Sequence, residues 1–546
     1  MATEKNWVEQ TADLVEKRVL ETRGRDAKIT CASGISPSGP VHLGNLREII
    51  TVHLVTEELK LRGWQAEHIH SWDDFDRLRK VPAGVPESFA DHVGKPLADV
   101  PDPSGKYPSY AERYKTEFEA AMHDLGINPR FISQAEAYRR GDYVAQMITA
   151  IERRFEIFDM LAEHQTLDRF EQTVEERREA YYPVRVYCES CGRDDTAITA
   201  YEPGSATIRY TCSGCGNAGE FSLFEKVPCK LVWKVDWPMR WAYEQVDFEP
   251  AGEDHAAPGS SYTVGAQLVQ KIYDFLPPVF IMYAFVGMAG RSKMSSSAGT
   301  TATPRAALDI LEPPILRWLY LRRNPGQKFA IDFGQEVIRL YDEWDTFAAR
   351  QPQASPADQK IYQLCVQTST GTVNRAARPV SFRLLSSAAD LTQGHQEQIA
   401  RIAADALDLP FEGSALIESL EPRLSCAINW ATRYLPEDER THVREDFAAE
   451  VYAGLDEPTK EGIALLLGRL DAGWSLEGLT KLVYAVPKIQ RGLPEDTKPD
   501  DVLKQAQRKF FIGIYQLICG ADTGPRLPTL FLSLGQEKVR RLLGEK

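Results

Sequence analysis

The sequence has no apolar run that approaches the about 18 residues needed to cross a membrane, and residues 1–25 are polar and amphipathic. We therefore expect neither a membrane span nor a secretory signal. The chain also lacks an excess of positive charge, with 64 Lys and Arg against 78 Asp and Glu and a net charge of −14. This balance argues against a protein that coats nucleic acid non-specifically, but it allows a nucleic acid bound to a local basic patch.

Cysteine is scarce, with nine residues in a chain of 546, and four of the nine form a tight cluster. This usage argues against a secreted disulfide framework and predicts a cytoplasmic protein. The cluster consists of Cys188-x-x-Cys191 and Cys212-x-x-Cys215, and a glycine follows each pair, as a metal-binding knuckle turn requires. Four cysteines at this spacing predict a tetrahedral structural Zn²⁺ site with no open position. Cys229 is predicted to be a core residue.

Length and composition shifts predict several domains, since a domain typically has about 100–200 residues. We expect the first half of an α/β domain with a helical insertion at 1–182, and a zinc-binding insertion at 183–227. The second half of the α/β domain is expected at 228–333, and a domain in which nearly every segment has helical period at 334–546.

A βαβ unit is predicted near the start of the chain. It consists of a strand at Lys28–Ala32, a loop of small residues at Ser33–Pro40, a helix from about His42 to Arg62 and a strand at Ala66–Ser71. Strand, Gly-rich loop, helix and strand within about 45 residues predict a parallel nucleotide-binding sheet.

The loop of this unit and the first turn of its helix carry the first motif. Small residues let the backbone approach a bulky ligand, and the N-terminal amides of the helix favour a phosphate. His42 and Asn45 point the same way and can each donate a hydrogen bond to a phosphate oxygen. An ordinary βα loop with a capping role is the alternative. The residues of the motif are Pro37, Ser38, Gly39, His42, Gly44 and Asn45.

The second motif lies some 250 residues later and is rich in hydroxyl groups and positive charge. Such a loop suits a triphosphate, because it can close over the charge that develops on a leaving pyrophosphate. A solvated Ser-rich linker is the competing interpretation. The motif comprises Arg291, Ser292, Lys293, Met294, Ser295, Ser296 and Ser297.

The two motifs in this order resemble the ATP-binding motifs of class I aminoacyl-tRNA synthetases. The resemblance implies a Rossmann-like catalytic core, activation of an amino acid as its adenylate with ATP and Mg²⁺, and transfer to the 3′ end of a tRNA. In that family His42, Asn45 and Lys293 would be catalytic. Two positions depart from the usual pattern: Asn45 stands where many members have a second His, and Ser296 where many have a second Lys. Lys293 or Arg291 would then have to supply the missing charge.

Further stretches resemble the class I lysyl-tRNA synthetases across essentially the whole chain. They are Ser33–Ser36, Ser71–Pro82, Trp233–Trp241 and Gly252–Tyr262. Lysine carries an ammonium at each end, so its site needs anionic or aromatic partners, and the carboxylates and Trp residues of these stretches fit that need. The resemblance assigns the amino-acid site to Gly34, Ser36, Asp74, Trp233 (or Trp237), His255 and Tyr283.

The same resemblance implies further properties of the chain. A lysine tRNA is the expected partner. The chain is expected to act as a monomer and to bind no membrane. The zinc-binding insertion would contact the acceptor end of the tRNA or serve as a purely structural element, and the helical C-terminal domain would read the anticodon. The predicted fold class is therefore α/β, with a Rossmann-like parallel-sheet core, an inserted zinc-ribbon-like module and an all-α C-terminal domain.

Two alternatives remain open at this point. A glutamyl- or arginyl-type enzyme of the same class would share both ATP motifs, although the acidic segment Asp73–Asp76 argues against an anionic amino acid. A catalytically silent paralogue that only binds tRNA is suggested by Ser296. The presence of His42, Asn45 and Lys293 argues against it.

Overall fold

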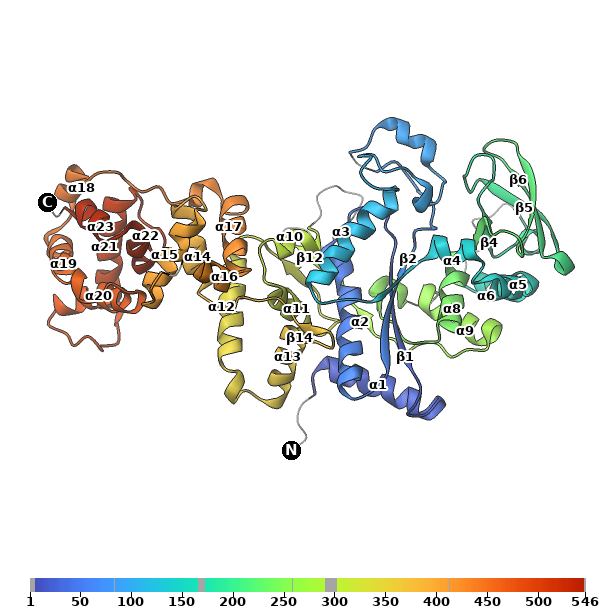
Figure 1. Cartoon of the computed structure of the whole chain (residues 1–546), viewed down its shortest axis with the longest axis horizontal. Coiled ribbons are helices and arrows are strands. Elements are labelled where there is room, and N and C mark those ends of the chain that lie inside the picture. The colour runs from blue at the N-terminus through green and yellow to red at the C-terminus, as the bar shows by residue number, and fades with distance from the viewer. Residues whose placement is uncertain are drawn as a thin grey trace. The chain divides into compact units, whose positions relative to one another are not determined.

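The computed structural model describes residues 5–82, 84–164, 172–257, 259–289, 302–411 and 413–544. The chain forms two compact units (Figure 1). The N-terminal unit consists of Met1–Ala307, Leu316–Ile331 and Gln351–Val373, and the C-terminal unit of Leu308–Ile315, Asp332–Arg350 and Asn374–Lys546. Across the described ranges, no helix is long and apolar enough to cross a membrane.

A parallel sheet forms the centre of the N-terminal unit, which confirms the predicted Rossmann-like core. Its strand order is β3-β2-β1-β9, with β1 at Ile29–Ile35, β2 at Ala66–Trp72, β3 at Arg130–Ser133 and β9 at Val246–Phe248. Short parallel pairs follow in the chain: β10 (Ala251–Gly252) with β11 (Met282–Tyr283), and β12 (Val286–Met288) with β13 (Phe329–Ile331). The carboxyl ends of parallel strands meet at one edge, where α/β proteins of this kind bind ligands.

Strand β1 is longer than predicted. The expected loop Ser33–Pro40 is wrong for its first three residues, because Ser33, Gly34 and Ile35 continue the strand and pair with His70, Ser71 and Trp72. The hydrogen bonds of a central strand outweigh the weak strand propensity of Ser and Gly. The loop proper therefore begins at Ser36, and the backbone of Gly34 lies at the sheet edge.

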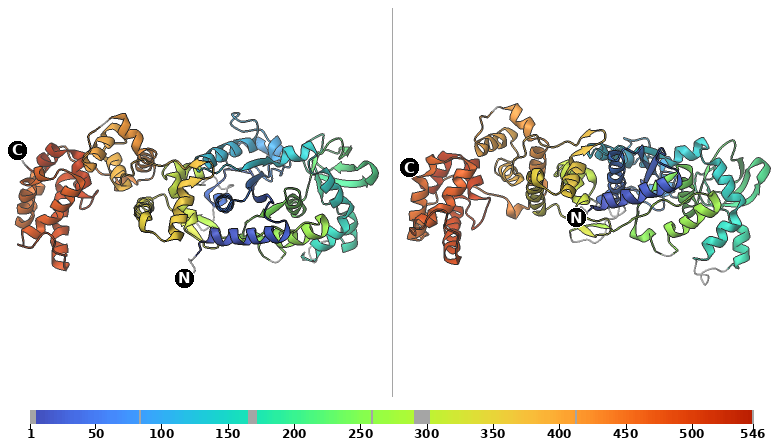
Figure 2. Two further views of the ribbon diagram at one scale, coloured as in Figure 1. Left: turned by 60° about the horizontal axis from the view of Figure 1, so that its bottom comes forward. Right: turned by 90° about the horizontal axis from the view of Figure 1, so that it is seen from below.

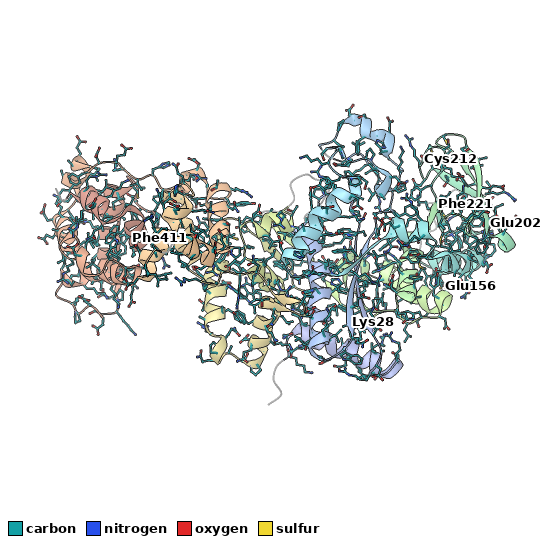
Figure 3. The ribbon with its side chains drawn as sticks, in the orientation of Figure 1. Lys28, Glu156, Glu202, Cys212, Phe221 and Phe411 are labelled. Carbon is teal, nitrogen blue, oxygen red and sulfur yellow. The ribbon has the colours of Figure 1, made fainter. Side chains whose placement is uncertain are left out.

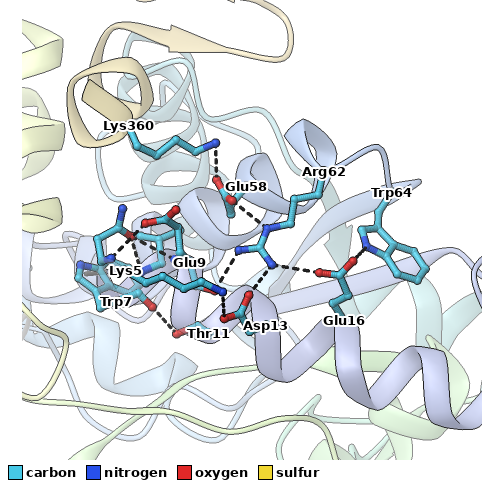
Figure 4. Close-up of polar contacts among 12 residues, drawn as sticks. Lys5, Trp7, Glu9, Thr11, Asp13, Glu16, Glu58, Arg62, Trp64 and Lys360 are labelled. Carbon is cyan, nitrogen blue, oxygen red and sulfur yellow. Dashed lines mark hydrogen bonds and ion pairs between the residues drawn. The ribbon is translucent and has the colours of Figure 1, made fainter. Parts of the chain in front are cut away.

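Helix α2 (Leu43–Leu61) follows this loop, as predicted, and is buried on most of its surface. Helix α1 (Trp7–Thr22) packs beside it through an ion-pair network around Arg62 (Figure 4). The Arg62 guanidinium donates to Asp13 at 2.7 Å, to Glu16 at 3.0 Å and to Glu58 at 2.8 Å. Several carboxylates on one half-buried guanidinium hold the carboxyl end of α2 against α1.

Around the sheet lie α3 (Tyr110–Asp124), α4 (Gln134–Arg140), α5 (Val144–Glu152), α6 (Arg154–Ala162), α7 (Val174–Ala180), α8 (Trp233–Tyr243) and α9 (Ser261–Tyr273). The chain continues through α10 (Pro304–Leu308), α11 (Pro313–Leu321) and α13 (Pro356–Val366).

The predicted zinc-binding insertion is a small β structure, here called the zinc module and defined as Val184–Leu231. Strand β4 (Val184–Val186) pairs antiparallel with β8 (Cys229–Leu231). Between them β5 (Thr196–Glu202), β6 (Thr207–Cys212) and β7 (Ala218–Ser222) form an antiparallel sheet. Cys212 ends β6 and Phe221 lies buried on β7 (Figure 3).

The C-terminal unit is built from helices (Figures 1 and 2). They are α12 (Glu336–Ala349), α14 (Phe382–Leu391), α15 (Gln396–Leu407), α16 (Ser414–Leu420), α17 (Arg423–Arg433), α18 (Ala449–Gly454), α19 (Glu457–Leu467), α20 (Leu476–Ile489), α21 (Asp501–Ile518), α22 (Leu527–Leu534) and α23 (Gln536–Leu543). The prediction of an all-α domain at 334–546 needs one correction. Strands β14 (Gln367–Thr368) and β15 (Gly371–Thr372) form a two-residue hairpin, which belongs to the N-terminal unit.

Candidate active site and metal centre

The first turn of α2 is organised by a reciprocal capping box. The Asn45 backbone N–H donates to His42 Nδ1, and the His42 backbone N–H donates to Asn45 Oδ1, each at 3.2 Å. Since His42 Nδ1 accepts a hydrogen bond, the neutral imidazole carries its proton on Nε2. In Asn45 the side-chain oxygen Oδ1 accepts, and the side-chain NH2 group is the donor. The cap therefore uses the acceptor atoms of both side chains.

Gly44 makes room for the His42 ring in this turn. A Cβ atom on Gly44 would lie 2.7 Å from His42 Nδ1 and 2.8 Å from its Cε1, closer than real Cβ contacts. The preceding loop is held by Tyr110 of α3, whose hydroxyl donates to the Ser38 carbonyl at 3.2 Å. Pro37 and Gly39 are buried in this loop, and Ser38 is exposed. The predicted residues of the first motif are thus brought together at one end of α2.

Glu48, two helical turns into α2, lies beside two residues of the predicted amino-acid site. Its carboxylate accepts from the Gly34 backbone N–H at 2.7 Å and from the Tyr283 hydroxyl at 2.6 Å. Surrounding protein desolvates the group, and the nearby carboxylates Glu249 and Asp73 oppose its ionisation, so the pKa of Glu48 is raised to about 8. The side chain is nevertheless partly accessible. No cation pairs with Glu48 among the contacts of the described residues.

Two further buried carboxylates share this environment. Glu249 accepts from the indole N–H groups of Trp237 at 3.0 Å and Trp241 at 2.6 Å, and burial raises its pKa to about 7. Burial also raises the pKa of Asp73 to about 6, although Arg240 at 2.9 Å opposes the shift. Like charges buried near one another disfavour ionisation, and a cationic ligand would relieve that cost.

Aromatic residues from α8 stand next to these carboxylates. Trp233 stacks on Trp237 with ring centroids 5.3 Å apart, and His255 meets Trp237 edge-on at 5.6 Å. Trp237 is buried, whereas Trp233 and His255 are partly accessible. Of the two tryptophans that the sequence left as alternatives, Trp233 is therefore the one that can offer surface to a ligand. Ser36 is likewise partly accessible, just beyond the end of β1.

Asp74 differs from the other predicted site residues, because its carboxylate is bonded by other parts of the protein. It accepts from Lys115 at 3.0 Å, from the Ser133 hydroxyl at 2.6 Å and from the Ala135 backbone N–H at 2.8 Å. These bonds join the end of β2 to α3 and to the start of α4. They give Asp74 a structural task.

The second motif falls outside the described residues. This applies to Arg291, Ser292, Lys293, Met294, Ser295, Ser296 and Ser297. The chain is described again from residue 302, where the Ala302 carbonyl accepts from the Leu43 N–H of α2 at 2.9 Å.

The four clustered cysteines converge as predicted for a metal site. Their sulfur atoms all lie within 4.8 Å of one another, with Cys188 to Cys215 at 3.6 Å and Cys191 to Cys212 at 3.7 Å. Tetrahedral Zn²⁺ with Zn–S bonds of about 2.3 Å requires sulfur separations of about 3.8 Å. Gly192 and Gly216, which follow the two pairs, both adopt φ near +74°, as knuckle turns need. The donor set and its geometry therefore fit Zn²⁺.

Sequence reasoning did not find Glu48, Glu249 or Arg240. The available signal for Glu48 was its spacing: His42, Asn45 and Glu48 follow one another at intervals of three on one side of α2. Glu249 and Arg240 gave no comparable signal, because their roles depend on contacts between segments distant in the sequence.

Comparisons with known proteins show the family to which the chain belongs. The sequence model of a family described as "tRNA synthetases class I (K)" matches residues 5–372. The chain is 45% identical to a lysine–tRNA ligase of Streptomyces coelicolor, over 99% of this chain and 98% of that one. It is 32% identical to a lysine–tRNA ligase of Pyrococcus horikoshii and 31% identical to one of Treponema pallidum, each over 97% of this chain and 98% of the relative. The similarity thus extends through both units.

Proposed function

Since the chain belongs to the class I tRNA synthetases of the lysine type, we propose that it activates lysine at the carboxyl edge of the parallel sheet, on the residues described above. Its reaction is that of a lysine–tRNA ligase: lysine and ATP form lysyl-adenylate and pyrophosphate, and the lysyl group passes to the 3′ end of a tRNA. The whole-chain similarity favours this reaction over the glutamyl- and arginyl-type alternatives.

The single observation that carries the substrate assignment is the desolvated carboxylate of Glu48, which is flanked by Glu249 and Asp73 and has no cationic partner among the residues that the structure describes. An ammonium group placed here would satisfy Glu48 and lower the repulsion among the three carboxylates. Buried polar groups matched to a substrate reject analogues that leave them unpaired. We therefore assign one lysine ammonium to Glu48 and the Tyr283 hydroxyl, with Gly34, Ser36, Trp233 and His255 as the surrounding walls.

ATP is assigned to the first turn of α2. His42 Nε2–H, the Asn45 amide and the amino end of the helix provide donors for phosphate oxygens. Catalysis of adenylate formation then rests on alignment of the lysine carboxylate with the α-phosphate and on stabilisation of developing charge. Lys293, Met294, Ser295, Ser296 and Ser297 are proposed to contact the phosphates, as the sequence predicts, and Mg²⁺ is proposed to accompany ATP.

Gly44→Ala is expected to weaken ATP binding, because the added Cβ would displace the His42 ring from the capping box. We expect KM for ATP to rise by about 10–100-fold, which corresponds to about 1–3 kcal/mol for a lost cap and phosphate contact. Pyrophosphate exchange at varied ATP concentration measures the change. Gly204→Ala is the matched control, since nothing lies within 4 Å of its added Cβ and it should leave KM unchanged. Equal KM values in the two variants would refute the assignment.

Lysine binding is expected to depend on pH through Glu48, whose pKa of about 8 lies above its ordinary value of 4.5. At pH 7 the group is mostly protonated without ligand, so binding of an ammonium should release a proton, and KM for lysine should fall as pH rises from 6.5 to 8.5. For the ligand-free protein the sign is opposite: the Glu48 contribution to the free energy of unfolding is present below pH 4.5 and is lost as pH rises through about 8.

Calorimetric titration of lysine in buffers of different ionisation enthalpy measures this proton release directly. A binding enthalpy that does not depend on the buffer, together with a KM for lysine that does not change with pH, would contradict the assignment of Glu48.

Several further features of the chain belong to this proposal. The division at 1–182, 183–227, 228–333 and 334–546 is proposed to separate the two halves of the catalytic domain, the zinc insertion and an anticodon-binding region. Zn²⁺ held by the four cysteines would stabilise the zinc module and take no part in the chemistry. The tRNA partner is proposed to be a lysine tRNA, and the enzyme a cytoplasmic monomer.

One assay tests the proposed function as a whole. Pyrophosphate exchange and tRNA charging are measured with each amino acid, always with tRNA present, since activation can depend on it. We expect lysine to be charged in preference to every other amino acid. Charging of another amino acid at least as well, or tRNA binding without any charging, would overturn the proposal.

A further inference from the structure

The segment Asp73–Arg77, at the carboxyl end of β2, is held from the side of the zinc module. Three successive residues of this segment each bond one residue of the module. The pairs are the Phe75 carbonyl with the Tyr187 hydroxyl at 2.5 Å, Asp76 Oδ1 with Lys230 Nζ at 2.6 Å, and Arg77 Nη1 with Asp194 Oδ1 at 3.2 Å. The position of the segment therefore depends on the module.

Asp194 ties this contact to the metal-binding turn. It comes three residues after Cys191, in a knuckle closed by the bond from the Cys188 N–H to the Arg193 carbonyl at 2.8 Å. Its side chain is 0% exposed and accepts from both Arg77 and Arg185. Its backbone N–H donates to the Gly94 carbonyl at 2.9 Å. A buried carboxylate with these partners fixes the turn against the segment.

A row of alternating charges leads from the module to the amino-acid site. The successive pairs are Asp76 with Lys230 at 2.6 Å, Lys230 with Asp236 at 3.4 Å, Asp236 with Arg240 at 3.4 Å, and Arg240 with Asp73 at 2.9 Å. Asp236 is also bonded by the Tyr138 hydroxyl at 2.5 Å. Apart from Asp76, whose side chain is 24% exposed, every side chain in the row is buried. The row ends on Asp73, beside Glu48 and Glu249.

We propose that the zinc module positions the lysine site, with Asp194 and Lys230 as positioning residues that act through Arg77, Asp76 and the row of charges. This role rests on the proposed function and adds to it. The module sets both the place of Asp73 and the balance of charge around Glu48, so disturbing its contact should weaken lysine binding and leave the ATP site unaffected. An arrangement of this kind uses supporting residues to hold binding groups within fractions of an ångström.

The test compares Asp194→Asn with Asp195→Asn in the full-length enzyme. The two positions are adjacent, and both substitutions remove one negative charge, but the Asp195 side chain is exposed, and the bonds from Arg77 and Arg185 go to Asp194. We expect both variants to keep one zinc equivalent. In Asp194→Asn the KM and the dissociation constant for lysine should rise by about tenfold, because the contact between the buried carboxylate and the partly exposed Arg77 guanidinium is weakened, while KM for ATP and for tRNA stays within about twofold. Asp195→Asn should match the wild type.

A second set of variants changes Arg77, the partner of Asp194 that lies outside the zinc module. Arg77→Gln should reproduce the tenfold loss of lysine affinity with zinc retained, and Arg77→Lys should restore most of it. The double variant Arg77→Gln with Asp194→Asn should lose no more than either single variant, because both act through one contact.

The outcomes separate this inference from the proposed function. If the wild type does not charge lysine, the proposed function fails. If the wild type charges lysine but Asp194→Asn and Arg77→Gln bind it as tightly as Asp195→Asn does, the positioning role is overturned. A rise in KM for tRNA alone would likewise overturn it, and would assign the module to tRNA contact.

Discussion

Glu48→Gln is expected to lower kcat/KM for lysine by about 10²–10³-fold, mainly through KM, with KM for ATP little changed. Glutamine keeps the shape of the side chain: its Oε1 can still accept from the Gly34 N–H, and its amide N–H can donate to the Tyr283 hydroxyl oxygen. What it removes is the charge that balances the lysine ammonium. Breaking a buried charge pair costs about 2–5 kcal/mol, and each 1.4 kcal/mol is tenfold.

Steady-state pyrophosphate exchange with tRNA present measures this effect. Glu21→Gln, an exposed carboxylate on α1, is the control and should leave both KM values unchanged. Tyr283→Phe should give a smaller loss, since it removes one neutral hydrogen bond to Glu48 and keeps the charge. A Glu48→Gln enzyme with wild-type KM for lysine would show that the ammonium binds elsewhere.

Cys188→Ser is expected to remove one equivalent of zinc per chain and to unfold the zinc module. The module consists of five short strands, so metal coordination should supply much of its stability; structural zinc sites contribute about 10–16 kcal/mol of apparent binding free energy in small domains. Metal analysis of the purified protein and the midpoint of thermal unfolding measure the two effects. Because the module also holds segment Asp73–Arg77, lysine affinity should fall as well.

The matched control is Cys519→Ser, a cysteine of the C-terminal unit outside the cluster, which should retain zinc and the wild-type unfolding midpoint. An unchanged zinc content in Cys188→Ser would refute the four-cysteine site. Zinc lost with lysine affinity retained would confirm the metal site but contradict the positioning role of the module.

Local features were predicted from the sequence because short-range chemistry decides them. The turn after β1, the helix from Leu43 and the two cysteine knuckles each depend on residue types a few positions apart, and the structure confirms each of them. The order of the two ATP motifs indicated the family, and the comparisons confirm that family. The loop predicted at Ser33–Ile35 was wrong for the opposite reason. Local propensity favoured a loop there, but hydrogen bonding to β2 makes these residues part of strand β1.

The groups that surround the proposed lysine ammonium became visible only in the tertiary structure. Glu48, Glu249 and Asp73 come from different elements, and their shifted pKa values arise from burial and mutual repulsion, which no spacing in the sequence encodes. The bonds of Asp74 to Lys115, Ser133 and Ala135 likewise became visible only in the tertiary structure. The sequence alone therefore determined the family, the reaction and the cluster of four cysteines, because these depend on local motifs. Which carboxylates are buried together was decided by long-range packing, because desolvation and charge pairing exist only once distant segments meet.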